Sequence, residues 1–319
     1  MDSFIYSINS TVPIFLVMIL GWLIKQWGII DDNFVNKANK YVFSVALPVM
    51  VFEDIAGGDI RSRFDIRFVL YCMIVTIVCF VGIWMLTELF MKDDTMKGSF
   101  VQGSFRSSAA ILGIAFIQNM YDSSGMAPLM IVSAVPLYNI FAVIVLTFKA
   151  SSEDGAQSVK PAENIKKACV NILKNPIIIG IFLGMFCSLI RVDFPIIIDR
   201  TVEYIGRTAT PIALIVIGAG FEGRKAIKKI KPTVVATFIK LIGQAAVFLP
   251  VAIWMGFRNQ ELMAILIMLA SPATVSGYIM AKNMNNDGVL ASSIIVLSTL
   301  LSALTLTGWI FLLRMWGYL

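Results

Sequence analysis

Long apolar runs separated by short polar segments make up almost the whole chain. An apolar run crosses a bilayer as a helix when it reaches about 20 residues. The pattern therefore predicts an all-α polytopic membrane protein with ten transmembrane helices. The predicted spans are 8–26, 35–57, 68–91, 98–120, 126–148, 176–192, 201–221, 232–257, 262–284 and 289–315.

Composition agrees with this pattern and narrows the chemistry. Hydrophobic residues make up 58% of the chain and charged residues 14%, whereas soluble domains carry about 25% charged residues. The net charge of +6 in such a chain reports membrane topology, so we expect no nucleic-acid partner. Histidine is absent, and the four cysteines have no metal or disulfide spacing. We expect no metal, no cofactor and, without the usual intramembrane protease motifs, no enzyme activity.

Lysine and arginine gather in the loops after the first, third, fifth, seventh and ninth spans. The densest group follows the seventh span and contains Arg224, Lys225, Lys228, Lys229 and Lys231. Basic loops stay in the cytoplasm, so both termini are predicted to face outward from a multi-pass protein of the cell membrane. The first run lacks a basic leader and a cleavage site, which favours a first span over a signal peptide.

A polar linker over residues 150–164 divides the chain into two halves, 1–149 and 165–319. The halves are related in sequence: Ser107–Met120 aligns with Ser271–Met284 at a shift of 164 residues. Pro48 aligns with Pro211 at a shift of 163, and both prolines are expected to kink their spans. Copies five spans apart cross in opposite directions, so the pattern predicts an inverted five-plus-five repeat typical of secondary transporters.

Each aligned stretch carries small and hydroxyl residues in the middle of a span. In the ninth span, Pro272 removes a backbone donor and frees the carbonyl of Met268. The residues around it are Ser271, Thr274, Ser276 and Gly277, and those in the fourth span are Ser107, Ser108 and Gly113. If both helices break and cross, their N-terminal ends favour an anion at the midplane. The alternative is that small residues only permit tight helix packing.

Polar side chains inside other spans are further candidates. Arg106 either binds a substrate carboxylate, or extends to the interface, or pairs with an acid. Asn139 lies in the middle of the fifth span and is expected to face the site. Lys240, with Gln244 one turn later, is expected to neutralise freed carbonyls where a cation-coupled carrier would hold sodium. The alternative for Lys240 is a structural role beside an acid.

Three stretches resemble the auxin efflux carrier family, which includes bacterial malate permease-like proteins. Ser271–Leu313 is similar to the signature of its last two spans, and Leu137–Leu146 to its fifth-span motif. Phe105–Ala115 is similar to the fourth-span motif, although Ser108 replaces an asparagine and Ala115 a proline. Auxin is therefore not carried over as the substrate.

The resemblance implies a fold like that of bile-acid:sodium symporters. Spans 1, 2, 6 and 7 would form a scaffold that dimerises, and spans 3–5 and 8–10 a transport domain that moves as an elevator. We therefore predict a secondary transporter of small organic anions, such as malate or an aromatic acid. A sodium- or proton-coupled symporter and a ligand sensor that does not transport are the alternatives.

Overall fold

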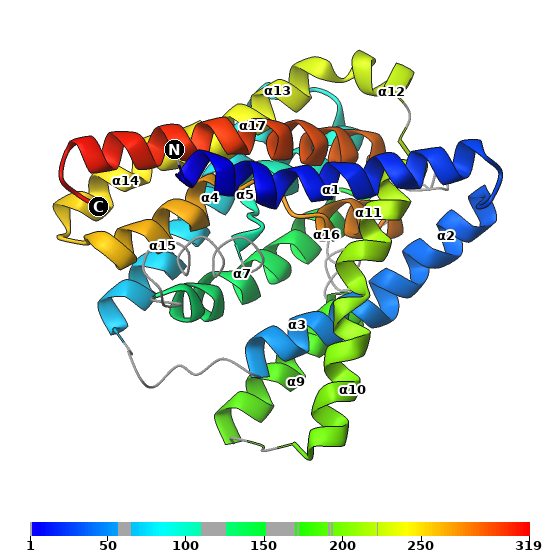
Figure 1. Cartoon of the computed structure of the whole chain (residues 1–319), viewed down its shortest axis with the longest axis horizontal. Helices are drawn as coiled ribbons and strands as arrows, with labels where there is room; N and C mark the ends of the chain where they lie inside the picture. The colour runs from blue at the N-terminus through cyan, green and yellow to red at the C-terminus, as the bar shows by residue number, and fades with distance from the viewer. Residues whose placement is uncertain are drawn as a thin grey trace, which may run out of the picture.

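The computed structural model describes residues 2–56, 65–109, 126–150, 170, 172–190, 192, 194–221 and 223–319 (Figure 1). Every regular element among these residues is a helix. The predicted all-α class is therefore confirmed. Gly113, most of the linker and the second half of the fourth span lie outside the described residues.

The described helices of the first half follow the predicted runs closely. They are α1 (Asp2–Gln26), α2 (Asp32–Tyr41), the π-helical turn η1 (Val42–Ala46), α3 (Leu47–Ala56), α4 (Ile66–Phe90), α5 (Asp94–Phe105) and α7 (Ala127–Phe148). The consecutive elements α2, η1 and α3 form one rod, which corresponds to the second predicted span. The fourth span begins with α5, which ends after 12 residues.

The second half contains more interruptions. Its described helices are α9 (Pro176–Ile190), α10 (Ile196–Arg207), α11 (Ala209–Ala219), α12 (Gly223–Lys228), α13 (Ile230–Phe238), the π-helical turn η2 (Ile239–Gly243), α14 (Gln244–Trp254), α15 (Asn259–Ala270), α16 (Ser276–Asn283) and α17 (Gly288–Met315). The predicted ninth span thus corresponds to two shorter helices, α15 and α16.

Five helices in the described part of the chain are long and apolar enough to cross a membrane. They are Ile66–Phe90, Ala127–Phe148, Ile196–Ala219, Ile230–Trp254 and Gly288–Met315. Three shorter apolar stretches of helix correspond to parts of other predicted spans: Phe15–Gln26 of α1, Pro176–Ile190 and Asn259–Ala270. The structure therefore establishes an all-helical chain with several membrane-length helices, while ten crossings stay a prediction.

Both aligned prolines lie just after a local distortion. A proline ring clashes with the carbonyl four residues earlier and offers that carbonyl no donor. For Pro48 this residue is Ser44, which lies inside η1. For Pro211 it is Arg207, the last residue of α10 before the turn at Thr208. At these two prolines the helix irregularity thus coincides with the carbonyl that the proline leaves without a donor.

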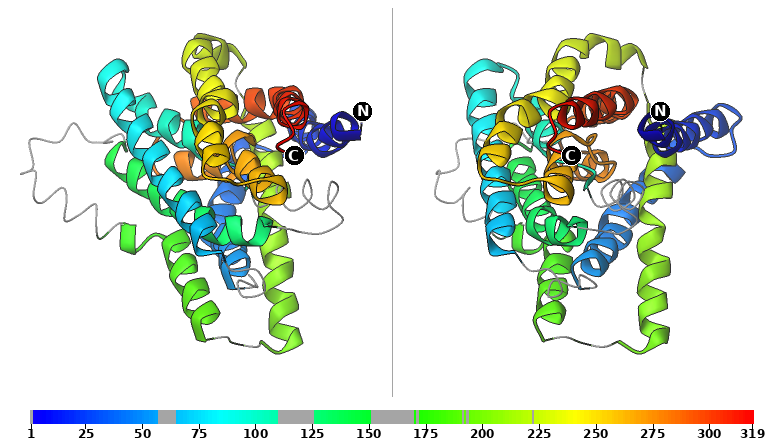
Figure 2. Two further views of the ribbon diagram at one scale, coloured as in Figure 1. Left: turned by 90° about the vertical axis from the view of Figure 1, so that its left-hand side faces the viewer. Right: turned by 60° about the vertical axis from the view of Figure 1, so that its left-hand side comes forward.

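The helices pack in two groups. In the first group α3 packs against α9 and α10, and α1 packs against α11. In the second, α4 packs against α5 and α7, while α15 and α17 pack against the rod from α13 to α14. Figure 2 shows α9 and α10 extending away from the other helices in both views. The groups meet most extensively where α1 lies beside α17 (Figure 1).

One close contact in the first group occurs twice. Gly21 of α1 lies so near Ile215 of α11 that a Cβ there would clash with the Ile215 carbonyl oxygen. Gly184 of α9 lies against Phe52 of α3, where a Cβ would be 3.0 Å from the Phe52 carbonyl oxygen. Gly21 and Gly184 are 163 positions apart, and so are Phe52 and Ile215. The same contact therefore recurs with the two halves of the chain exchanged.

Candidate functional site

The fourth predicted span is interrupted directly after Phe105. Arg106 caps α5 in an extended conformation, with φ −84° and ψ 133°, and residues 106–108 are not helical. The Arg106 amide still donates to the Gln102 carbonyl oxygen at 3.2 Å. An extended segment at this depth must find its hydrogen bonds within the protein, because the bilayer offers none.

The ninth span is interrupted at the predicted proline. Ser271 caps α15 with φ −71° and ψ 156°, and helix resumes only at Ser276. The amide of Ala273 donates to the hydroxyl of Ser298 on α17 at 3.1 Å. The two interruptions meet, since the Ser108 amide donates to the Pro272 carbonyl oxygen at 2.9 Å. Two broken helices, far apart in sequence, therefore satisfy each other's backbone at one place.

Side chains of neighbouring helices satisfy the carbonyl oxygens freed at these breaks. The Met268 carbonyl oxygen, which Pro272 leaves without its helical donor, accepts from the Ser107 hydroxyl at 2.5 Å and the Tyr138 hydroxyl at 3.1 Å. At the end of α5, the carbonyl oxygen of Ser104 accepts from the Gln244 amide at 2.5 Å. Hydrogen-bond donors from α7, from α14 and from the opposite break thus satisfy the carbonyl oxygens at the interruptions.

Lys240 places a positive charge at the C-terminal end of α15. It lies in η2, is fully buried, and its ammonium donates to the Leu269 carbonyl oxygen at 2.5 Å. The C-terminal end of a helix carries a partial negative charge, so α15 favours a cation there. No carboxylate of the described residues lies within salt-bridge distance of this ammonium. Its observed partner is therefore a freed carbonyl and not an acid.

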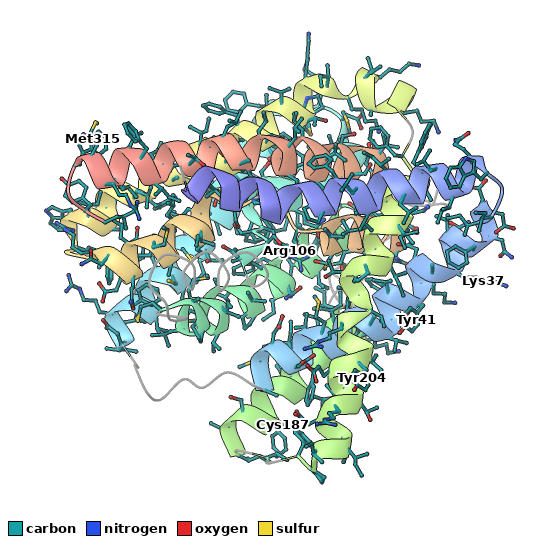
Figure 3. The ribbon with its side chains drawn as sticks, in the orientation of Figure 1. Lys37, Tyr41, Arg106, Cys187, Tyr204 and Met315 are labelled. Carbon is teal, nitrogen blue, oxygen red and sulfur yellow. The ribbon has the colours of Figure 1, made fainter. Side chains whose placement is uncertain are left out.

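Arg106, the residue directly after α5, is also buried, with 5% of its surface exposed. Its guanidinium donates to Asn139 Oδ1 at 2.5 Å and to Met280 Sδ at 2.8 Å. Asn139 is fixed in turn by its amide, which donates to the Val135 carbonyl oxygen at 3.0 Å. Figure 3 places Arg106 well inside the helices, whereas Met315 lies at their edge. The guanidinium therefore points inward and contacts neutral groups among the described residues.

A small cavity of about 10 Å³ lies beside the crossing, between α5, α16 and α17. That is roughly the space of one water molecule. Gln102 donates to the Gly277 carbonyl oxygen at 2.8 Å, while its own oxygen and the buried Ser99 hydroxyl have no partner among the described residues. The hydroxyls of Thr274 and Ser276 lie 3.1 Å apart. The cavity thus offers unsatisfied oxygen atoms next to the broken helix.

The predicted residues fall into three sets. One set lies together at the crossing: Arg106, Ser107, Ser108, Asn139, Lys240, Gln244, Ser271, Pro272, Thr274, Ser276 and Gly277. Pro48 and Pro211 lie in the other helix group, away from the crossing. Gly113 is outside the described residues. The described residues contain no cluster of histidine, cysteine, aspartate or glutamate able to hold a metal.

Several groups at the crossing were not predicted from the sequence. Gln102 precedes Arg106 by one helical turn on α5, so its position on the same face was readable from the spacing. Tyr138 is adjacent to Asn139 but points to a different partner, and Met280 looked like an ordinary apolar residue. For these two residues the sequence carries no distinguishing signal.

A family profile described as membrane transport protein matches residues 6–310 of the chain. The uncharacterized transporter YfdV of Escherichia coli K12 is 22% identical over 314 residues, which cover 97% of this chain and 98% of that protein. A protein of Rhizobium meliloti named "Putative malonate transporter" is 23% identical and covers 95% of this chain and 94% of its own length.

An uncharacterized transporter of Methanothermobacter thermautotrophicus is 18% identical over 96% of this chain and 98% of that protein. These relatives are transporters by name, they align along nearly their whole lengths, and the family match covers almost the entire chain. The apolar helices agree with embedding in a membrane. The chain belongs to the membrane transport protein family, that of the auxin efflux carriers its motifs resemble.

Proposed function

We propose that this membrane transporter is a secondary carrier of small organic anions that binds its substrate at the crossing of the two interrupted helices. The observation that carries the proposal is the buried guanidinium of Arg106, whose described partners, Asn139 and Met280, are both neutral. A buried charge without a counter-ion is costly in a membrane protein and marks a functional position by default. A carboxylate on the substrate would supply a negative charge that neither described partner provides.

The proposed substrate class follows from this chemistry. A guanidinium has five N–H donors, and the hydrogen bonds to described residues use two of them. Ser276 and Thr274 add hydroxyl groups near the N-terminus of α16, whose partial positive charge favours an anion. The name of the Rhizobium meliloti relative refers to malonate, a small dicarboxylate. We extend this class, with malate and aromatic acids as further candidates, to the present chain.

We further propose that Lys240 acts as a built-in cation. In carriers with broken helices, freed backbone carbonyls can coordinate sodium, and here the Lys240 ammonium already donates to the freed Leu269 carbonyl oxygen. Transport by this chain is then independent of sodium. The alternative, a sodium- or proton-coupled symporter, predicts a cation requirement that the fixed ammonium would make unnecessary.

The wider architecture belongs to the same proposal. Ten crossings in an inverted repeat are supported by the duplicated contact of Gly21 with Ile215 and of Gly184 with Phe52. A scaffold of spans 1, 2, 6 and 7 and a moving transport domain of the other six are supported by the two packing groups. We place the protein in the cell membrane with both termini outside, and propose that the scaffold forms the homodimer.

The test is a thermal-shift screen of organic acids on the purified protein, with and without sodium. The proposal expects stabilisation by malonate or a related carboxylate that does not change when sodium is replaced by choline. Stabilisation that appears only with sodium would instead favour the symporter. Binding without any transport in proteoliposomes would favour a sensor.

A further inference from the structure

An ion pair lies on the outside of the membrane-length stretch formed by α10 and α11. Arg207 lies at the middle of this 24-residue stretch, Ile196–Ala219, about 17 Å from either end at 1.5 Å per residue. Its side chain is 72% exposed and pairs with Glu203 one turn earlier. Charges at this depth normally face the interior of a helix bundle or a water-filled cavity, because hydrocarbon solvates them poorly. We therefore expect another molecule to cover this ion pair.

The exposed charges lie on the side of α10 that faces away from its neighbours in the chain. Tyr204, which is 64% exposed, is three residues before Arg207 and shares its side of the helix. Gly206 lies on the opposite side and is buried against Met50 and Glu53 of α3. Figure 2 agrees with this arrangement, since α10 extends away from most of the other helices. One side of α10 thus packs within the first helix group, and the other points outward.

The first half of the chain adds a matching exposed surface. Tyr41 and Ser44 lie 163 positions before Tyr204 and Arg207, and both are exposed. The hydroxyls of Tyr41 and Thr208 are 3.0 Å apart, which joins the two surfaces. Figure 3 shows Tyr41 and Tyr204 on the same side of the molecule. We call the surface formed by Tyr41, Ser44, Glu203, Tyr204 and Arg207 the outer face.

We propose that the outer face is the contact between two copies of this chain, related by a twofold axis along the membrane normal. Such an axis places equivalent residues of the two copies at the same membrane depth. Glu203 of one copy can then reach Arg207 of the second copy, so that each charge meets an opposite charge on both chains. The outer face carries one positive and one negative charge, so it is complementary to itself. The two tyrosines supply the aromatic contacts that are enriched at interfaces.

The depth of the ion pair favours a second copy over a lipid. The hydrocarbon core is about 30 Å thick, so only acyl chains, and no headgroups, lie beside the middle of a span. A different membrane protein would need opposite charges at the same depth, whereas a second copy has them by symmetry. The inference rests on the homodimer of the proposed function, and it names the surface and the ion pair that hold the two copies together.

Charge reversal with rescue tests this contact on the full chain in membranes. In a twofold contact, Glu203→Arg or Arg207→Glu brings four like charges together, so the dimer affinity should fall about tenfold or more. Co-expression of the two variants with different affinity tags restores opposite charges across the contact. A doubly tagged pair should then be recovered at the wild-type level. The matched control, Arg314→Glu, reverses an exposed arginine near the end of α17 and should leave dimer formation unchanged.

Size-exclusion profiles and melting temperatures verify that each variant is folded. If a charge-reversal variant does not fold alone, Tyr204→Cys in a background without other cysteines replaces it. This variant should be linked into a dimer by a bifunctional maleimide, whereas Ile74→Cys at an exposed position of α4 should not. Wild-type dimer affinity in both folded charge variants, or equal cross-linking at the two cysteine positions, would overturn the outer face as the contact.

Two further outcomes separate this inference from the proposals on which it rests. Loss of the dimer in both charge variants without recovery on co-expression would overturn the exchange of Glu203 and Arg207 between copies. A wild-type chain that is monomeric in membranes would overturn the homodimer as well as its contact. Exchange of labelled malonate by the wild type, measured in parallel, reports on the anion carrier separately from either outcome.

Discussion

The ammonium nitrogen of Lys240 lies 2.5 Å from the carbonyl oxygen of Leu269, near the C-terminal end of α15. This oxygen lies one residue after the Met268 carbonyl that Pro272 frees. The buried ammonium of Lys240 therefore stabilises the broken helix at a carbonyl that lacks its helical donor.

Replacing this cation tests its role in transport. Lys240→Gln should abolish uptake, because a shorter neutral side chain leaves the Leu269 carbonyl unpaired at a cost of about 1–3 kcal/mol. Uptake of labelled substrate into proteoliposomes is the measurement, with the exposed Lys37→Gln as the matched control. Normal uptake by a folded Lys240→Gln protein would disprove the role proposed for the ammonium.

Arg106 is predicted to hold the substrate through a planar pair of hydrogen bonds. Arg106→Lys keeps the charge but loses that geometry. Losing one charged hydrogen bond costs about 1.5–3 kcal/mol, so the KM for transport should rise about 10- to 150-fold. The exposed Arg200→Lys on α10 is the control. An unchanged KM in the Arg106 variant would place substrate binding elsewhere.

The Met268 carbonyl accepts from two hydroxyls, and this predicts non-additive stability changes. Ser107→Ala and Tyr138→Phe should each reduce the free energy of unfolding by about 1 kcal/mol, because one donor remains. The double variant should lose more than the sum of the two, since the buried carbonyl then has no donor. Melting temperatures of the purified protein measure this, with Thr305→Ala on α17 as the control. Additive changes would mean that the two hydroxyls do not substitute for each other as donors to the Met268 carbonyl oxygen.

The duplicated glycine contact predicts matched effects in both halves of the chain. Gly21→Ala and Gly184→Ala should both destabilise the protein, because the added methyl group meets a neighbouring backbone. Gly82→Ala in α4 meets no atom within 4 Å and should stabilise by up to about 1 kcal/mol through helix propensity. If Gly184→Ala resembled Gly82→Ala, the contact would not be a shared feature of the repeat.

The sequence predicted the class of fold and the location of the breaks for simple physical reasons. Apolar runs of membrane length define helices, and Pro272 leaves the Met268 carbonyl without its helical donor, which favours a break there. Lys240 was recognised as well, because a charge in an apolar run needs a partner. The partners of these groups were not predictable. Gln102, Tyr138 and Met280 reach the crossing through helix rotation, which tertiary packing decides.

Counterflow in proteoliposomes tests the central claim most directly. Vesicles loaded with unlabelled malonate and placed in sodium-free buffer should take up labelled malonate faster than vesicles without protein. The account predicts that this exchange is unchanged by added sodium and is lost in Arg106→Gln. Binding of malonate, malate and aromatic acids without any exchange, or exchange that requires sodium, would contradict it.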